Sequence, residues 1–210
     1  MSILVKDLIE RGHLKSERII EAFRQIDRAE FVPADMAGQA YEDIALPIGY
    51  GQTISQPLTV AFMLELLDPQ EGQNILDVGS GSGWTTALLA HIVGASGRVT
   101  AMEKVEGLCE FGKKNVAKFG FIKKNIVEFY CISAEKGFER NAPYDRILVS
   151  ADTKEIPEVF KNQLAVGGKM VIPVSDSICL VEKRGQDKFH VEEFPGFAFV
   201  PFVKDTKGGA

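Results

Sequence analysis

The pattern of hydrophobic and polar positions changes about one third of the way along the chain. Near the N-terminus, a short helix ends at Gly12, and apolar residues then recur at helical spacing between Ser16 and Ile26. Ser16 is of a type that favours the N-cap of a helix. Residues 31–57 are rich in Pro and Gly and have no sustained periodicity, whereas 57–67 again predict a helix. Because aromatic and aliphatic residues recur through 31–57, we expect an ordered loop that packs over a site.

From residue 74 onwards, strand-like and helix-like segments alternate. Continuous apolar strands that alternate with helices predict an α/β fold with a doubly wound, mostly parallel sheet covered on both faces. The last two predicted strands form a hairpin with Gly185 near its turn. The predicted strands are 74–80, 97–103, 126–133, 144–152 and 167–175, the predicted helices are 84–94, 107–120 and 157–164, and the hairpin is 178–194.

The length of 210 residues fits a single domain. We expect 1–56 to form an N-terminal region of helices and loop, 57–203 to form the α/β core, and 204–210 to be a frayed tail.

Charge and hydropathy exclude some classes of partner. The formal net charge is −5 and the isoelectric point is near 5.3, which argues against nucleic-acid binding through a global positive field. No apolar run approaches the roughly 18–20 residues that span a bilayer. We therefore expect a protein that binds neither nucleic acid nor membrane.

The three cysteines, Cys109, Cys131 and Cys179, are isolated in the sequence. Their spacing suits neither a zinc site nor a disulfide framework. An odd number of isolated cysteines without a signal peptide favours the reducing cytoplasm. The three histidines are also scattered without the spacing of metal ligands, and we expect no metal site.

The sharpest local signal is ILDVGSGSGW, residues 75–84. Gly79, Gly81 and Gly83 lie between a predicted strand and a predicted helix, where glycine permits a tight turn and close approach of a ligand. Asp77 precedes them, and the spacing differs from that of dinucleotide-binding loops. Glu103 ends the next strand, where an acidic side chain can accept hydrogen bonds from both hydroxyls of a ribose. The alternative is a tight turn without a ligand.

These features together resemble the class I S-adenosylmethionine-dependent methyltransferases. The resemblance implies a Rossmann-like methyltransferase sheet that binds S-adenosyl-L-methionine. The glycines would then pass under the methionine and ribose parts of the cofactor, and Asp77 would help to set its amino end.

The rest of the chain is similar to one family of these enzymes, the protein-L-isoaspartate O-methyltransferases. The similarity runs from about residue 16 to residue 203 and includes the stretch GQTISQP, 51–57. The other matching segments are 30–67, 142–152, 156–174 and 197–202.

By this resemblance, the hydroxyl of Ser55 is catalytic and that of Thr53 assists it. Gln52, Ile54 and Val200 would bind substrate. An isoaspartyl side chain carries a carboxylate that is already ionised at neutral pH, so the site needs to orient it and has no proton to remove. The alternative role for Ser55 or Gln56 is to cap the helix that begins at Pro57.

Two positions depart from the family pattern. Ser133 stands where relatives have the Asp that holds the adenine end of the cofactor, and Glu135 is an alternative for that role. Ala198 stands where relatives have an Arg before Phe-Val-Pro.

The expected function is repair methylation of isoaspartyl residues in damaged proteins and peptides by a cytoplasmic monomer. Two alternatives stay open. One is a related methyltransferase that acts on another carboxylate or a small molecule, and the other is a binding protein that has lost catalysis.

Overall fold

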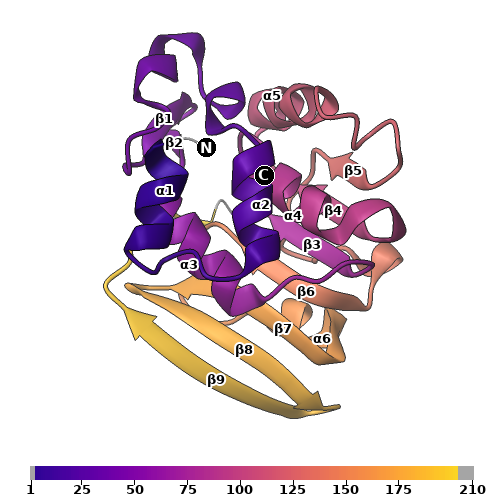
Figure 1. The fold of residues 1–210 in the computed structure, drawn as a ribbon. Coiled ribbons are helices and arrows are strands. Elements are labelled where there is room, and N and C mark those ends of the chain that lie inside the picture. Colours follow the sequence, from indigo (N-terminus) through magenta and orange to yellow (C-terminus); the bar gives the residue numbers. More distant parts are fainter. Residues whose placement is uncertain (1–2, 203–210) are drawn as a thin grey trace, which may run out of the picture.

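A computed structural model of the protein describes residues 3–202, and its centre is a seven-stranded sheet. The strand order is β5-β4-β3-β6-β7-β8-β9. The first five of these pair in parallel, and β8 and β9 add an antiparallel hairpin at the edge opposite β5 (Figure 1). The predicted doubly wound, mostly parallel α/β fold is confirmed. The strands are β3 (Asn74–Val78), β4 (Arg98–Met102), β5 (Val127–Tyr130), β6 (Tyr144–Val149), β7 (Leu164–Val174), β8 (Ser177–Gly185) and β9 (Lys188–Pro195).

Helices cover the two faces of the sheet unevenly. Alternate residues of one strand serve the two faces, so Ile75 belongs to a large apolar cluster and Leu76 to a smaller one. The large cluster fills the space between the sheet and α3, α4 and α5, and it extends outward to residues of α1 and α2. Figure 1 shows these helices on one face of the sheet. The smaller cluster is covered by α6 and by irregular segments that follow β5 and β6. The helices are α1 (Ile3–Glu10), α2 (Glu17–Gln25), α3 (Pro57–Leu67), α4 (Trp84–Val93), α5 (Glu106–Ala117) and α6 (Glu158–Gln163).

The predicted loop over 31–57 is ordered, as expected, but it contains short regular elements. Two 3₁₀ helices, η1 (Arg28–Phe31) and η2 (Ala34–Gln39), precede a hairpin of strands β1 (Leu46–Gly49) and β2 (Gln52–Ile54). Each element has six residues or fewer, which is too short to show a period. Two further 3₁₀ turns, η3 (Gly94–Ser96) and η4 (Glu139–Asn141), connect core elements.

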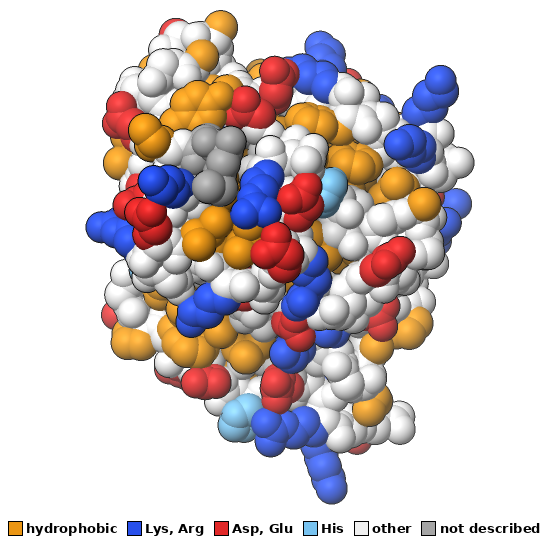
Figure 2. All heavy atoms as spheres, in the orientation of Figure 1, with side chains coloured by type: hydrophobic (Ala, Val, Ile, Leu, Met, Phe, Trp, Pro, Cys, Tyr) orange, Lys and Arg blue, Asp and Glu red, His pale blue; other side chains and the backbone are white. Residues whose placement is uncertain are grey.

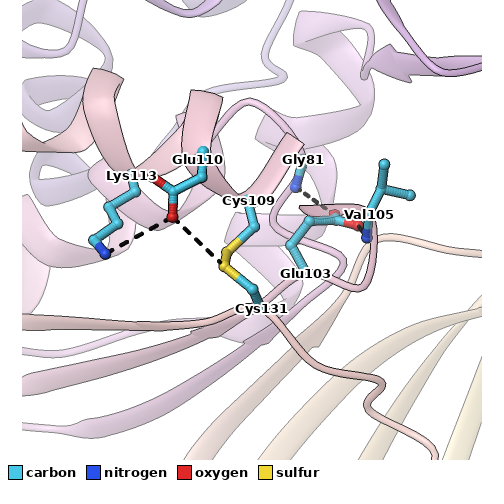
Figure 3. Close-up of a disulfide and its surroundings, with 7 residues drawn as sticks. All are labelled: Gly81, Glu103, Val105, Cys109, Glu110, Lys113 and Cys131. Atoms are coloured by element: carbon cyan, nitrogen blue, oxygen red, sulfur yellow. Dashed lines mark hydrogen bonds and ion pairs between the residues drawn. A yellow bond between two sulfur atoms is a disulfide. The ribbon is translucent and has the colours of Figure 1, made fainter. Parts of the chain in front are cut away.

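The expectation that the spacing of the cysteines suits no disulfide framework did not anticipate a bond between two of them. Cys109 in α5 and Cys131 just after β5 form a disulfide, and Cys179 is free and buried (Figure 3). The two bonded residues are 22 positions apart in the sequence. They meet because the crossover from β4 through α5 to β5 returns the chain beneath the helix. Spacing between cysteines does not show that crossover, and the sequence argument for a reducing compartment loses its support.

The surface over α1 and α2 carries charges of both signs, interspersed (Figure 2). Several of them pair within the helices, such as Lys6 with Glu10 and Arg24 with Glu17. No helix among residues 3–202 has the length and apolar character to cross a bilayer. The predicted frayed tail, 204–210, lies outside the described residues.

Candidate active site

The glycine loop is a tight turn between the end of β3 and the start of α4. Gly79, Gly81 and Gly83 have φ values of 75°, 51° and 85°, a region in which side chains with a Cβ are strained. The backbone N–H groups of Gly79 and Ser80 both donate to the carbonyl oxygen of Met102, at 2.9 and 3.1 Å. The turn is therefore fixed against the carboxyl end of β4, the place where open α/β sheets bind ligands.

The three glycines have different surroundings. A Cβ on Gly83 would lie 2.8 Å from the carbonyl oxygen of Gly112 in α5, so this glycine permits close packing of two helices. A Cβ on Gly81 would lie 3.4 Å from the side chain of Ile48 in the β1–β2 hairpin. Gly79 and Gly81 face a cavity, whereas Gly83 faces α5.

Glu103 connects the glycine loop to the segment that leads into α5. One carboxylate oxygen accepts a hydrogen bond from the N–H of Gly81 and the other accepts one from the N–H of Val105, each at 2.9 Å (Figure 3). The side chain is buried but borders the cavity. Each carboxylate oxygen has two lone pairs, so Glu103 keeps the capacity to accept hydrogen bonds from a ligand.

Asp77 lies behind the loop and is fully buried. Its Oδ2 accepts hydrogen bonds from the hydroxyls of Thr86 and Thr85, at 2.6 and 3.1 Å, and its Oδ1 has no partner among the described residues. Burial raises the pKa of Asp77 to about 6, and the nearby Glu103 adds to that rise. The threonine hydroxyls oppose it because they bond to the charged form.

The cavity in front of the loop, which we call the glycine-loop cavity, lies between the carboxyl ends of the strands and the β1–β2 hairpin. The hairpin reaches across it, and the side chain of Tyr50 at its tip lies against Gly107 in α5. A Cβ on Gly107 would stand 2.1 Å from the Tyr50 hydroxyl. The lining residues are Ile48, Gln52, Thr53, Val78, Gly79, Gly81, Met102, Glu103, Lys104, Val105, Leu108, Ile132, Ala134, Ser150, Ala151, Val200, Pro201 and Phe202.

A second cavity, which we call the hydroxyl cavity, adjoins the first. The two share four residues: Thr53, Ser150, Val200 and Pro201. The described residues that line it include no charged side chain and present the hydroxyls of Thr53, Ser55, Thr59 and Ser150. Its other lining residues are Ala45, Gln56, Ala198 and Phe199. Two ligands bound in the adjoining cavities could therefore meet at the shared wall.

The hydroxyl of Ser55 is not needed to cap helix α3. Gln56 occupies the N-cap position and makes no side-chain cap bond. Instead, Asp43 from the preceding loop accepts a hydrogen bond from the N–H of Leu58 at 2.8 Å. An acidic group at a helix N-terminus is favourable, so this contact stabilises α3 and leaves Ser55 directed to the hydroxyl cavity.

Comparison with known proteins identifies the family. The sequence model of the protein-L-isoaspartate(D-aspartate) O-methyltransferases matches residues 1–207. The chain belongs to this family. The protein-L-isoaspartate O-methyltransferase of Methanopyrus kandleri is 43% identical over 204 residues, which cover 95% of this chain and 89% of that protein. The one of Aeropyrum pernix is 41% identical over 204 residues, covering 95% and 78%.

A solved structure supports the methyltransferase fold. It is that of the isoaspartate methyltransferase of Plasmodium falciparum in complex with S-adenosyl-L-homocysteine. It has a TM-score of 0.86 and covers 96% of this chain and 97% of that one at 24% identity. The family resemblance and the Rossmann-like methyltransferase fold expected from the sequence are thus confirmed.

In this family member, most of the residues predicted for the site lie at one of the two cavities. The glycine-loop cavity is lined by Gly79, Gly81, Glu103 and Gln52. Ser55 lines the hydroxyl cavity, and Thr53 and Val200 lie in the wall that the two cavities share. The predicted residues outside both linings are Asp77, Gly83, Ile54 and Ser133.

The side chains of Ile54 and Ser133 point elsewhere. Ile54 is buried in the large apolar cluster, because alternate residues of β2 face opposite sides and its neighbours Thr53 and Ser55 take the open side. The hydroxyl of Ser133 accepts a hydrogen bond from the N–H of Glu135 at 3.4 Å. The cavity is bordered instead by the neighbours of Ser133, Ile132 and Ala134.

Sequence reasoning missed Ser150, Ile48 and Phe202. Ser150 directly follows β6, which is the neighbour of β3 in the sheet. The rule that ligands bind at the carboxyl ends of parallel strands could have found it. Phe202 reaches the site because the segment after β9 returns to it, where the N–H of Phe202 donates to the carbonyl oxygen of Asp152 at 2.8 Å. The family resemblance pointed to Val200 in the same segment, but no hydrophobic or polar pattern near Phe202 indicates the return of the chain.

Proposed function

We propose that this protein transfers the methyl group of S-adenosyl-L-methionine to the free carboxylate of L-isoaspartyl residues in damaged proteins and peptides. One observation carries the proposal beyond family membership: a cavity with an acidic side chain and a glycine cradle adjoins an uncharged cavity lined by hydroxyls. The first suits a ligand that brings cationic and ribose groups, and the second suits an acceptor that brings its own negative charge.

The residues around the glycine-loop cavity fit the cofactor. Gly79 and Gly81 allow the ligand to approach the backbone, and Glu103 has lone pairs left for the ribose hydroxyls. Asp77 lies behind the loop and outside both cavity linings, and its buried carboxylate adds negative charge near the place proposed for the cationic amino end of the ligand. Ile132 and Ala134 line the cavity and would supply an apolar wall for the adenine, where the family pattern has an acidic partner. The bound cofactor supplies a methyl group on a positively charged sulfur.

The hydroxyl cavity orients the acceptor. The isoaspartyl carboxylate has an ordinary pKa of about 4, so it is ionised at neutral pH and needs no general base. Ser55 and Thr53 donate hydrogen bonds that aim one carboxylate oxygen at the shared wall. A cationic side chain would stabilise the free carboxylate more than the transition state, in which that charge is being lost. The uncharged lining avoids that cost.

The test is transfer of labelled methyl to two peptides that differ only in one residue, L-isoaspartyl or normal L-aspartyl. We expect label in the isoaspartyl peptide alone, in a form released by mild base because the product is a methyl ester. Equal labelling of both peptides would support a broader carboxyl methyltransferase instead. No labelling of either peptide, with cofactor bound, would overturn the proposal.

Calorimetric titration with S-adenosyl-L-methionine is a separate control. We expect saturable binding to one site per chain. A protein that shows no heat of binding at millimolar cofactor would be a non-catalytic member of the family. Gly81→Val, whose side chain would contact Ile48 and strain the backbone, is expected to weaken binding at least tenfold.

We also propose that the protein works as a monomer in the cytoplasm without binding nucleic acid. The net charge of −5 argues against binding nucleic acid through a positive field, and the proposed cofactor is an intracellular metabolite. Intracellular disulfides are frequent in hyperthermophiles, so the Cys109–Cys131 bond is compatible with that compartment in such a host. Light scattering at assay concentration tests the monomeric state, and cell fractionation tests the compartment. A filter-binding assay with duplex DNA tests whether the protein binds nucleic acid.

A further inference from the structure

Arg28 is a buried cation in the N-terminal region, at the start of η1. Its side chain is only 3% exposed, although arginine is one of the residues least often buried. Burial lowers the pKa of its guanidinium to about 10, and Asp43 counteracts part of that effect. At neutral pH the group therefore stays charged, and its charge needs partners.

The partners are four backbone carbonyl groups from two separate segments. One guanidinium nitrogen, Nη1, donates to Ala40 at 2.9 Å and to Glu42 at 3.3 Å. The other, Nη2, donates to Ile44 at 2.8 Å and to Ser55 at 3.1 Å. Residues 40–44 enter the β1–β2 hairpin, and Ser55 follows its end. The guanidinium thus joins both ends of the hairpin that crosses the glycine-loop cavity.

A contact with an aromatic ring connects Arg28 to the cofactor side of the site. The guanidinium carbon lies 5.3 Å from the centre of the Trp84 ring. This distance is within the range of a cation–π interaction. Trp84 is the first residue of α4 and follows Gly83 directly. Arg28 therefore contacts the hairpin on one side and the helix that begins at the glycine loop on the other.

We propose that Arg28 is a positioning residue for methyl transfer, which holds the backbone of Ser55 in register with the glycine loop. The inference rests on the proposed function, in which the Ser55 hydroxyl orients the acceptor. A planar guanidinium with two forked Nη groups can satisfy four carbonyls at once, whereas a lysine ammonium has only three donors around one nitrogen. Lysine keeps the charge but must leave part of this set unpaired, so Ser55 loses its fixed position.

The experiment compares Arg28→Lys with the wild-type protein. For the isoaspartyl peptide we expect kcat, expressed per cofactor site counted by calorimetry, to fall ten- to hundredfold. The Kd for S-adenosyl-L-methionine should stay within threefold, because the cofactor contacts are not changed. Arg11→Lys is the matched control, since the Arg11 side chain is exposed and bonds to Asp7 within α1. It should match the wild type in both values.

Two outcomes overturn the proposal. One is an Arg28→Lys protein with wild-type kcat, and the other is a protein that loses cofactor binding in proportion to activity, which marks a purely structural role.

If the wild-type protein itself methylates no isoaspartyl peptide, the proposed function fails but the positioning role is still measured by hydrogen exchange. Faster exchange confined to residues 40–56 of Arg28→Lys then supports it. Unchanged exchange over 40–56 contradicts it.

Discussion

At the scale of single residues, Ser55 carries the chemistry that distinguishes this site. Removal of its hydroxyl in Ser55→Ala should lower kcat about ten- to hundredfold and leave the Kd for S-adenosyl-L-methionine unchanged, since the residue lines only the hydroxyl cavity. Ser96→Ala, on the exposed turn η3, is the matched control. Steady-state kinetics and calorimetry measure the two quantities. A variant with normal kcat would remove Ser55 from the mechanism.

Asp77 should make stability depend on pH in a defined window. Its pKa rises from 3.8 to about 6 on folding because the carboxyl group is buried. The folded protein therefore holds the proton more tightly, and this stabilising contribution is complete below about pH 4 and lost as the pH rises to about 6. The size of the effect is roughly 2–3 kcal/mol.

Asp77→Asn, which cannot ionise, supplies the comparison. Urea unfolding of both proteins without cofactor, between pH 4 and pH 7, should show the wild type losing free energy of unfolding relative to the variant up to about pH 6. Above that value the difference should be constant. A difference that does not change across the range would mean that Asp77 has an ordinary pKa.

The sequence allowed prediction of which residues gather at the site better than of where each side chain points. Gly79, Gly81 and Glu103 follow parallel strands, so strand direction alone places them at one edge of the sheet. Ile54 and Gly83 belong to the same motifs yet face the core and α5. The direction in which Ile54 points depends on the pleat of β2, and that of Gly83 depends on how closely α5 approaches. Both depend on contacts between distant parts of the chain.

At the scale of elements, the β1–β2 hairpin is the part that the pattern could not resolve. Its strands have four and three residues, and four of these residues, Leu46, Ile48, Gln52 and Ile54, are half-buried or buried against the cavity or the core. The Gly-Tyr-Gly tip has positive φ at all three positions. Its position over the cavity comes from Arg28 below and from Tyr50 against Gly107 at the tip, and each of these contacts joins elements far apart in sequence.

The disulfide between α5 and the end of β5 should stabilise both the fold and the cofactor cavity. Closing a loop of 22 residues restricts the unfolded chain by about 3 kcal/mol, which corresponds to roughly 6–12 °C in Tm for a chain of this length. The neighbours of the two cysteines, Leu108 and Ile132, line the glycine-loop cavity. Reduction should therefore also weaken cofactor binding.

Melting curves and calorimetry with and without a reductant measure these effects. The double variant Cys109→Ser, Cys131→Ser should have the same Tm and the same cofactor affinity with and without the reductant. It keeps Cys179 as an internal control, because that thiol is buried elsewhere, in β8. Thiol titration of the unfolded, unreduced wild-type protein should count one free cysteine. A count of three would contradict the bond.

At the scale of the whole molecule, one face of the sheet is covered by a large apolar cluster with five helices, and the other face is covered much more sparsely. The large apolar cluster runs without interruption from α1 and α2 through α3 and α4 to the strands, so the N-terminal region is packed onto the core. The other face, within residues 3–202, is covered by one helix of six residues, α6, and by irregular segments. The site lies where these irregular segments, the returning chain at Val200 and the hairpin meet. Burial thus fixes the scaffold, and segments with little secondary structure complete the cavities.

This packing leads us to propose that residues 1–56 and the α/β core unfold as one domain. Trp84 is the single tryptophan, and it contacts Phe23 of α2 with ring centres 5.5 Å apart and Arg28 of η1. Its fluorescence therefore reports on the junction between the two parts, whereas far-ultraviolet circular dichroism reports on the whole chain. Because one apolar cluster spans the junction, separating the parts would expose its core, and both signals should follow one transition with the same midpoint in urea. If the fluorescence transition came first, the N-terminal region would be a separate unit that could leave the site while the core stayed folded.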